Sequence, residues 1–344
     1  MFRRLHRAVD ALFSAGTVSN LIVRVGQNGT VLYDLFRSSE ERTLNEHTLF
    51  DMASVTKIVA TTSLFLLALD RGEIHPCDPV GKYLPVPKDK EGLTLFHLLT
   101  HTIGSGHKSM LGCKGGYAEI AEYILSIPCD IPIGSDVRYS CPAFILLGRI
   151  LEGVYGMGLS DAFERYVAAP LGLSESHFLP DRSLDIVNSN RIAENCGLVN
   201  DYNCRYLGGV CGNAGLFSSL RDMTRYVEML LRSGEPLVSR ETFALATKNH
   251  TPGMSESRGL GFLCVDERYT QAGGLFSASA FGHCGHTGQS VFFDPKNGLY
   301  VIVLSDATVS TIHKYGKENY GEVIRMRGDL HAAIRADLFE NSEL

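Results

Sequence analysis

Ser54 and Lys57 lie three positions apart at the start of a long apolar segment of the chain. Residues at positions i and i+3 share one face of a helix, with Cβ atoms about 5–6 Å apart, so the amine can reach the hydroxyl. A buried lysine has a lowered pKa because burial disfavours its charged form, and a neutral amine can accept a proton. The pair therefore predicts an activated serine nucleophile with a lysine general base. The alternative is a core helix in which Lys57 extends to the surface.

The same spacing occurs a second time, at Ser105 and Lys108, in a stretch that is rich in glycine. No apolar segment follows this second pair. Residues 58–69, by contrast, are apolar except for three hydroxyl-bearing side chains. A helix that is apolar on all sides is a buried one. The sequence context therefore favours Ser54 as the nucleophile.

A serine and lysine pair also needs a group that carries a proton to the leaving group. Tyr139 lies in a polar stretch just before the apolar residues 144–151. Pro142 suits the first turn of a helix there, and Ser140 or Cys141 suits its N-cap. A phenol beside an ammonium group has a lowered pKa and can relay protons. The alternative is a tyrosine that only packs against its neighbours.

A third polar segment, residues 281–290, contains regularly spaced glycines together with His283 and His286. Glycines within a strand often mark the close approach of a ligand or of another backbone. Backbone N–H groups at such a strand edge can stabilise the oxyanion that forms during acyl transfer. The alternative is a bulged strand whose histidines face the solvent.

Metal binding is not expected at either pair of histidines. His283 and His286 have no third ligand at a suitable spacing. His97 and His101 are four positions apart, as in the helix of zinc proteases, but Leu98 replaces the glutamate that follows the first histidine there. We expect structural hydrogen bonds from this pair, and no metal and no cofactor in the protein.

The composition is that of an ordinary globular protein, with 344 residues of which 44% are hydrophobic. This is enough apolar material for a sizeable core in one or two domains. The net charge of −6 is modest, and lysine and arginine are scattered along the chain. Neither nucleic acid nor an anionic membrane is therefore an expected partner. The apolar run between Lys57 and Asp70 is shorter than the about 20 residues that a membrane helix needs.

Cysteine usage indicates a reducing compartment. The nine cysteines are an odd number and contain no CxxC pair, which argues against a disulfide scaffold or a zinc ribbon. Asp10 and Arg7 interrupt the segment that a secretory signal would need to be apolar. We therefore expect reduced thiols and a cytoplasmic location.

The pattern of helices and strands favours an α+β fold. Two β-rich runs joined through Asn28-Gly29 predict one hairpin, and two runs around residues 294–298 predict another. The expected strands are residues 21–25, 31–36, 290–293 and 299–304, and the expected helices are residues 4–15, 95–99, 117–125, 144–151, 160–166, 223–231 and 322–338. An antiparallel sheet built from both ends and flanked by helices, with an inserted helical region, accommodates this order. We place the sheet domain at residues 1–75 and 246–344, the mainly helical region at residues 76–245, and the active site at their junction.

The order of these segments resembles the serine hydrolases of the class C β-lactamase and penicillin-binding protein superfamily, which also contains esterases and D-aminopeptidases. Residues 50–57, 93–102, 139–148 and 208–218 resemble its sequence blocks, so the resemblance covers nearly the whole chain. It implies a β-lactamase/transpeptidase-like fold. It also implies that Ser54 is the nucleophile, Lys57 the base and Tyr139 the proton relay.

The chain departs from the usual second and third motifs of that superfamily. The second is usually Tyr-x-Asn, and Cys141 stands at the position of the asparagine. The third is usually Lys-Thr-Gly, for which the segments beginning at His283 and at His286 compete. The spacing to the Asp294-Pro295 turn favours His283. The resemblance then implies an oxyanion hole made by the N–H groups of Ser54 and His286.

The resemblance also implies which other residues line the substrate site. These residues are Cys141, Asn213, His283, Cys284 and Gly285. Asn213 belongs to the glycine-rich block at residues 208–218, which lies near the rim of the active site in the resembled superfamily. A histidine in place of the usual lysine predicts a preference for neutral substrates, because it is largely uncharged at pH 7.5. Anionic substrates should then bind better as the pH falls from about 8 to 6.

The sequence thus predicts a cytoplasmic serine hydrolase that forms an acyl-enzyme at Ser54 with a small ester, amide or peptide. The runner-up is a β-lactamase or D-Ala-D-Ala peptidase, which is less favoured because those substrates lie outside the cytoplasm. A rival of another class is a catalytically weak protein that binds a peptide or a cell-wall fragment, since both the asparagine and the lysine of the motifs are replaced. The sequence does not indicate an oligomeric state.

Overall fold

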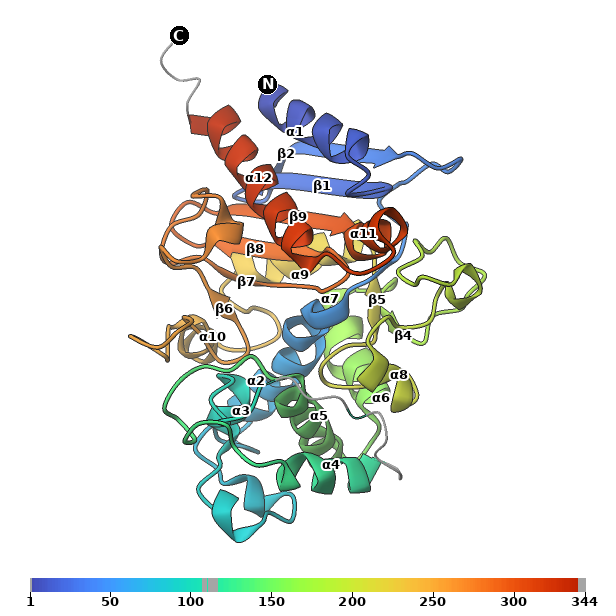
Figure 1. Ribbon diagram of the computed structural model, residues 1–344. Coiled ribbons are helices and arrows are strands. Elements are labelled where there is room, and N and C mark those ends of the chain that lie inside the picture. The colour runs from blue at the N-terminus through green and yellow to red at the C-terminus, as the bar shows by residue number, and fades with distance from the viewer. Residues whose placement is uncertain (1, 107–109, 111–116, 340–344) are drawn as a thin grey trace.

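The computed structural model describes residues 2–106, 110 and 117–339. Its largest sheet has six antiparallel strands in the order β2-β1-β9-β8-β7-β6, drawn from both ends of the described chain (Figure 1). The strands are β1 (Asn20–Gln27), β2 (Thr30–Ser38), β6 (Leu263–Cys264), β7 (Phe281–Cys284), β8 (Ser290–Asp294) and β9 (Leu299–Ser305). The predicted α+β class with an antiparallel sheet is confirmed.

Two short turns set the register of this sheet. Asn28 and Gly29 have φ angles of 51° and 80°, and a two-residue hairpin turn of this type needs positive φ at both central positions. In the second hairpin, the Gly298 N–H donates a hydrogen bond to the Asp294 carbonyl oxygen at 2.9 Å. Both predicted hairpins are therefore present, with their turns at the expected residues.

Helices cover both faces of the sheet. On one face α1 and α12 lie side by side, and on the other face α9 packs against β8 and β9 (Figure 1). Neighbouring residues of a strand point to opposite faces, so Val23 joins the core under α1 and α12, whereas Ile22 joins the larger core on the other face. The helices on this sheet are α1 (Arg3–Ser14), α9 (Leu220–Leu231), α11 (Ala307–Tyr315) and α12 (Tyr320–Phe339).

The middle of the sequence forms a mainly helical region beside the sheet (Figure 1). It contains α3 (Leu95–Leu99), α4 (Tyr117–Ser126), α5 (Cys141–Tyr155), α6 (Leu159–Phe163), α7 (Ala169–Leu171), α8 (Tyr202–Tyr206) and α10 (Arg240–Thr247). Each helix that the sequence predicts is present. A second sheet has the order β3-β5-β4, formed by β3 (Phe50–Asp51), β5 (Leu216–Ser218) and β4 (His177–Phe178). Its strands of two or three residues are too short to show an alternating pattern, so the sequence did not predict them.

The buried segment after Lys57 is not a regular α-helix. It begins with a 3₁₀ turn, η1 (Ala53–Val55), widens into a π-helical stretch, η2 (Lys57–Thr62), and continues as α2 (Ser63–Asp70). All side chains of η2 are buried, as predicted. Among the described residues, Ala53–Asp70 is the one continuous helical segment long and apolar enough to cross a membrane, and 78% of it is buried inside the protein.

Candidate active site

Ser54 lies on a tight turn that enters this segment. Ala53, just before it, has a φ of 45°, a left-handed conformation that residues with a Cβ rarely adopt and that is frequent at functional sites. The Asp51 carboxylate holds the turn, because it accepts hydrogen bonds from the Ala53 N–H at 2.9 Å and from the Asn200 N–H at 2.6 Å. Burial raises the pKa of Asp51 to about 6, although these N–H groups lower it. The turn presents Ser54 at the floor of a cavity.

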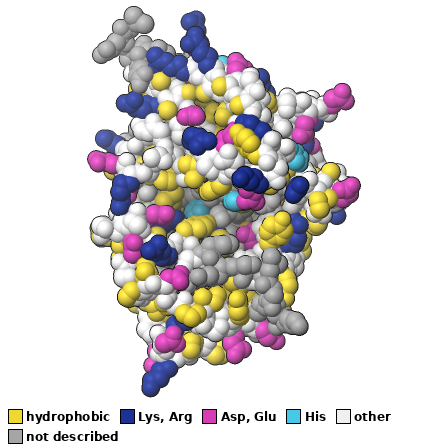
Figure 2. Space-filling model, viewed as in Figure 1, with side chains coloured by type: hydrophobic (Ala, Val, Ile, Leu, Met, Phe, Trp, Pro, Cys, Tyr) yellow, Lys and Arg dark blue, Asp and Glu magenta, His cyan; other side chains and the backbone are white. Residues whose placement is uncertain are grey.

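The cavity has a volume of about 970 Å³ and lies between the edge of the main sheet and the helical region. Figure 2 shows a hollow in the middle of this face of the molecule, with histidine atoms visible at its edge. The residues that line it and matter for the chemistry are Ser54, Tyr139, Cys141, Arg258, His283 and Cys284. They come from four separate stretches of the sequence.

Ser54, Lys57 and Tyr139 meet at the floor of this cavity. The Lys57 Nζ donates a hydrogen bond to the Ser54 Oγ at 2.9 Å, and the Tyr139 hydroxyl donates another at 2.7 Å. Lys57 also contacts the Cys141 Sγ at 3.6 Å and donates to the Asn213 carbonyl oxygen at 2.9 Å. The three residues predicted as catalytic are therefore brought into direct contact.

The protonation of Lys57 differs from the sequence prediction. Burial lowers the pKa of its amine, but the anionic forms of Cys141 and Tyr139 raise it by more, so the pKa lies above its usual value. The predicted lowering of the Lys57 pKa is therefore wrong. The helix pattern showed that Lys57 is buried but not which acidic groups surround it.

The pKa of the Tyr139 phenol is also higher than the sequence predicted. Burial raises the pKa of Tyr139 to about 12, against the lowering effect of the Lys57 ammonium. The predicted lowering of the Tyr139 pKa is also wrong. Both shifts favour the protonated forms, which are the Lys57 ammonium and the neutral Tyr139 phenol.

His101 supports the Tyr139 segment. Its ring lies 4.7 Å from the Tyr139 ring between centroids, and its Nδ1 accepts a hydrogen bond from the Ser140 N–H at 3.0 Å. Ser140 is the N-cap of α5 and accepts from the Ala143 N–H at 3.3 Å. The predicted structural role of His101 and the predicted N-cap are confirmed. No three His, Cys, Asp or Glu side chains of the described residues are placed to hold a metal ion.

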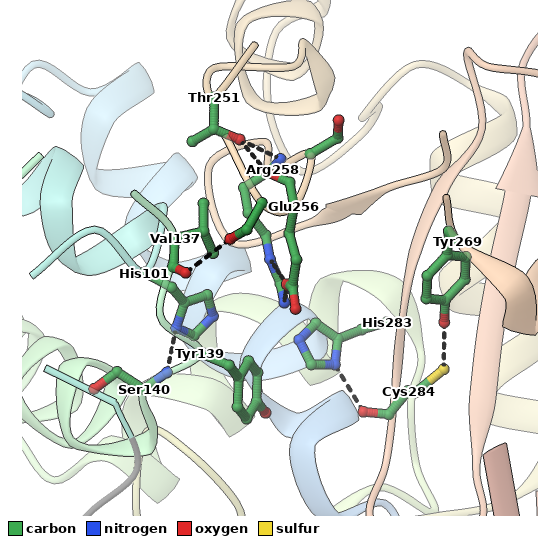
Figure 3. Close-up of polar contacts among 12 residues, drawn as sticks. His101, Val137, Tyr139, Ser140, Thr251, Glu256, Arg258, Tyr269, His283 and Cys284 are labelled. Carbon is green, nitrogen blue, oxygen red and sulfur yellow. Dashed lines mark hydrogen bonds and ion pairs between the residues drawn. The ribbon is translucent and has the colours of Figure 1, made fainter. Parts of the chain in front are cut away.

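His283 lies inside the site and His286 at its outer edge. The His283 ring is 6.1 Å from the Tyr139 ring and is 3% exposed, and Figure 3 shows it between Tyr139 and Cys284. The His286 ring instead stacks on Tyr320 at 4.9 Å, and its Nε2 lies 3.3 Å from the Glu318 carboxylate. The side chain beside the proposed proton relay is thus that of His283.

His283 does not gain a charge in the physiological range. Burial lowers its pKa well below 6.5, and the positive charges of Arg258 and Lys57 lower it further. In the neutral ring, Nδ1 donates to the Cys284 carbonyl oxygen at 2.8 Å, and Nε2 has no hydrogen-bond partner in the described part of the chain. The predicted protonation of His283 between pH 8 and 6 is therefore wrong.

Asn213 and Cys141 lie at different depths in the site. Asn213 is fully buried beneath the nucleophile and contacts Lys57 through its backbone carbonyl, so the expectation that it faces the substrate is not met. Its side-chain amide has no hydrogen-bond partner among the described residues. Cys141 opens α5 and lines the cavity, and its Sγ lies 3.6 Å from the Lys57 Nζ. Ser105 is buried, and Lys108 lies outside the described residues.

Gly285 brings the turn after β7 against the turn that carries Ser54. A Cβ added to Gly285 would lie 2.6 Å from the Met52 carbonyl oxygen, closer than real contacts allow. The Thr287 hydroxyl donates to the Asp51 carbonyl oxygen at 2.8 Å on the same side. Cys284, at the end of β7, contacts the Tyr269 hydroxyl at 3.0 Å. The glycine signal in the sequence therefore marks a close approach of two backbones.

Arg258 is the residue of the site that the sequence did not reveal. Its guanidinium carbon lies 5.4 Å from the Tyr139 ring centroid, its side chain is almost fully buried, and its Nε donates to the Glu256 carboxylate at 3.0 Å (Figure 3). Its Nη1 has no hydrogen-bond partner within the described residues. Only the pairing of β6 with β7 brings the segment that contains Arg258 to the site, so no local pattern could identify it.

Comparisons with known proteins identify the family and the fold of this chain. The family model described as Beta-lactamase matches residues 5–323. The chain is 29% identical over 308 residues to a protein of Escherichia coli (strain K12) named "Putative D-alanyl-D-alanine carboxypeptidase", covering 77% of this chain and 70% of that protein.

Two solved structures show a similar fold. The class C β-lactamase from Rhodobacter sphaeroides superposes with a TM-score of 0.76 at 20% identity, covering 96% of this chain and 99% of that one. EstCE1, described as a hydrolase with promiscuous acyltransferase activity, gives a TM-score of 0.73 at 21% identity and covers 96% and 98% of the two chains. The fold is that of the β-lactamases, and the chain belongs to the Beta-lactamase family.

Proposed function

We propose that this member of the family is a serine hydrolase that forms an acyl-enzyme at Ser54 with ester or amide substrates. The observation that carries the proposal is the Ser54 Oγ, which accepts hydrogen bonds from both Lys57 and Tyr139 on the floor of the cavity. The described residues offer no metal site, and acyl transfer of this kind needs only a nucleophile, a base and oxyanion donors.

Acylation begins once the Lys57 and Tyr139 pair has lost one proton. The neutral amine, or the phenolate, accepts the Ser54 hydroxyl proton while Oγ forms a bond to the substrate carbonyl carbon. Tyr139 then donates that proton to the leaving alkoxide or amine as the bond to the leaving group breaks. In the second half of the reaction, water gives a proton to the same pair and its oxygen bonds to the acyl carbon. The pair then returns that proton to the Ser54 Oγ as the bond between Oγ and the acyl carbon breaks, which releases the acid and restores the Ser54 hydroxyl.

The N–H groups of Ser54 and His286 are proposed to hold the oxyanion. The turn that carries His286 is fixed against the nucleophile turn by the close approach of Gly285 to Met52 and by the hydrogen bond from Thr287 to Asp51. Two N–H groups held in this way stabilise the negative charge that develops on the carbonyl oxygen without reorganising.

Active-site labelling tests the proposal. A fluorophosphonate and a slowly hydrolysed p-nitrophenyl ester should both acylate the purified protein on Ser54, with a burst of one product per chain. Ser54→Ala should abolish the adduct and the burst, and Ser105→Ala should leave both unchanged. An adduct mapped to Ser105, or a protein that takes up no label yet retains a peptide or a cell-wall fragment, would favour the rival binding protein.

A carboxypeptidase or β-lactamase activity is the second candidate, and Arg258 favours it. A buried guanidinium that lies beside the Tyr139 ring and has an unpaired N–H can hold a substrate carboxylate, as the substrates of both enzyme classes require. A relative bears a carboxypeptidase name. Matched substrates with and without a carboxylate, such as a D-alanyl-D-alanine peptide and its C-terminal amide, distinguish this candidate from an esterase.

Arg258→Met tests which candidate applies. If Arg258 holds a carboxylate, the variant should raise the KM of the charged substrate about tenfold or more and leave that of the amide unchanged. Arg268→Met is the matched control, because Arg268 also lines the cavity but is exposed and pairs with Asp266. Equal effects of Arg258→Met on both substrates would leave esters and neutral amides as the substrate class.

A further inference from the structure

Arg327 is a buried cation that has no role in the reaction described above. It lies on α12 and is 0% exposed. Burial lowers the pKa of its guanidinium, but Cys284, Tyr320 and Tyr269 raise it by more, so the group keeps its charge. The ion pairs found between described residues do not include it. A buried positive charge without a carboxylate partner destabilises the folded protein, so the presence of Arg327 needs an explanation.

The contacts of Arg327 lead to the turn after β7. Its Nη2 donates a hydrogen bond to the Gly285 carbonyl oxygen. Its Nη1 donates to the Gln271 Oε1 at 2.8 Å and lies 3.5 Å from the Tyr320 hydroxyl, which keeps the guanidinium in place. Among these acceptors, the Gly285 carbonyl is the one that adjoins the proposed oxyanion hole.

The Gly285 carbonyl and the His286 N–H belong to one planar peptide group. In a trans peptide these two bonds point in opposite directions, so a donor that fixes the carbonyl also fixes the direction of the N–H. A cation at the oxygen also draws electron density from the amide nitrogen, which makes the N–H a stronger donor. The His286 N–H donates to no backbone carbonyl of the described residues, so it is free to face a substrate.

The other side of this peptide is held as well. Gly285 lies against the Met52 carbonyl of the nucleophile turn, and the Thr308 hydroxyl donates to the carbonyl oxygen of His286. The peptide is therefore fixed on one side by the nucleophile turn and on the other by the helices that cover the sheet. Arg327 is the charged member of this support.

We propose that Arg327 is a positioning residue of the oxyanion hole, which orients and polarises the Gly285–His286 peptide. The proposal rests on the proposed function, because it matters only if Ser54 forms a tetrahedral intermediate next to that peptide. Arg327 touches neither the substrate nor Ser54. It acts on the reaction through the hydrogen-bond strength of the His286 N–H.

Arg327→Met should lower kcat and leave KM for a neutral ester nearly unchanged. Removal of an oxyanion donor costs about 10²–10³-fold in kcat. Here the N–H remains but loses its support, so a decrease of about 10-fold to 100-fold is expected. Arg327→Lys keeps a charged donor on the same side and should recover part of the rate.

The infrared spectrum of the acyl-enzyme gives a readout that a structural role would not change. An acyl group carrying ¹³C at its carbonyl is attached to Ser54, and its carbonyl stretch is measured in the difference spectrum against the ¹²C form. Weaker hydrogen bonds in the oxyanion hole raise this frequency. The frequency should be highest in Arg327→Met, intermediate in Arg327→Lys and lowest in the unmodified protein.

Arg24→Met is the matched control. Arg24 is also buried and charged, but it pairs with Asp34 between β1 and β2, at the other end of the sheet. This control should lower Tm without changing the carbonyl frequency or kcat. If Arg327→Met does not fold, Gln271→Leu, which removes the acceptor of Nη1, should still raise the frequency by a smaller amount.

The outcomes separate the two proposals. Folded Arg327 and Gln271 variants that acylate at Ser54 with unchanged kcat and carbonyl frequency would overturn the role of Arg327 and leave the proposed function standing. If the unmodified protein forms no acyl-enzyme at Ser54, the proposed function itself fails. A frequency that rises in Arg327→Met and partly returns in Arg327→Lys supports the proposal.

Discussion

The Lys57 Nζ lies 2.9 Å from the backbone carbonyl oxygen of Asn213, beneath the nucleophile. This acceptor belongs to the backbone, so it stays in place when the Ser54 Oγ moves to bond with the substrate. The Lys57 amine can therefore keep this hydrogen bond in both its neutral and its charged form. The contact holds Lys57 in the buried site beside Ser54, so its side chain does not extend to the surface.

Replacement of Lys57 should remove most of the activity. Lys57→Met keeps the apolar part of the side chain but removes the amine that takes the Ser54 proton, and loss of a general base costs about 10²–10⁴-fold in rate. KM should change far less than kcat. Lys90→Met is the control, since Lys90 is also buried but pairs with Asp89 in another part of the chain. Steady-state measurements of kcat and KM for both variants test this prediction. A near-normal kcat in Lys57→Met would exclude the mechanism.

The acylation rate should rise with pH well above neutrality. The pKa values of Lys57 and Tyr139 both lie above their usual values, so the deprotonated pair that accepts the Ser54 proton becomes more abundant as the pH increases. Values of kcat/KM for a neutral ester report the free enzyme, and they should increase by up to about tenfold per pH unit through pH 8–10. A plateau already reached at pH 7 would show that the free site holds a deprotonated base.

The affinity for anionic substrates should not improve between pH 8 and 6. The pKa of His283 is well below 6.5 because of burial and of the charges on Arg258 and Lys57, so its ring stays neutral across this range. The KM of the charged substrate divided by that of the matched neutral substrate should therefore stay constant. A ratio that decreases as the pH is lowered from 8 to 6 would show that His283 takes up a proton.

The protein should lose stability as the pH falls from 6.5 to 4. Burial lowers the pKa of His331 to about 4, whereas the unfolded chain has a value near 6.5. The stabilisation is complete above pH 6.5. It is lost as the pH falls, because His331 is protonated in the unfolded state but stays neutral in the folded state. The full effect is roughly 3 kcal/mol. His331→Gln, which retains a donor to the Gln271 carbonyl, should flatten the curve of Tm against pH.

His101 and His283 act in the same direction as His331, since burial also lowers their pKa values well below 6.5. The His331→Gln curve should therefore be less steep than that of the unmodified protein but not flat. An unchanged slope would mean that His331 titrates normally in the folded protein.

A methyl group at Gly285 should impair catalysis more than folding. In Gly285→Ala the new Cβ would lie 2.6 Å from the Met52 carbonyl oxygen, so the turn that carries His286 must move away from Ser54. We expect a fall in kcat of about tenfold or more. The control is Gly153→Ala in the exposed part of α5, where a Cβ meets nothing within 4 Å. That change should stabilise the protein by about 0.5–1 kcal/mol and leave kcat unchanged.

Local patterns predicted the hairpins, the longer helices and the pair of Ser54 and Lys57. Turn residues, apolar runs and an i, i+3 spacing act over a few residues and can be recognised in the sequence. The short strands of the second sheet and the change from 3₁₀ to π geometry around Lys57 depend instead on packing by distant segments. No stretch of a few residues specifies them.

The electrostatics of the site could not be predicted for the same reason. Lys57 was expected to lose its proton because the sequence showed its burial but not its proximity to Cys141 and Tyr139. Arg258 and Arg327 reach the site from segments that only strand and helix packing bring there. Charged residues that are distant in the sequence therefore change pKa values in ways that the pattern of a single helix does not predict.

The second and third strands of the main sheet are β1 and β9, which pair so that Leu21 lies opposite Ser305. Contacts between residues so distant in the sequence form slowly, because a long loop must close before they stabilise the chain. During synthesis the nucleophile segment is complete long before β7, β8 and β9 leave the ribosome. The nascent chain therefore carries Ser54 and Lys57 without the turn of the proposed oxyanion hole, and hydrolytic activity should arise only with the last step of folding.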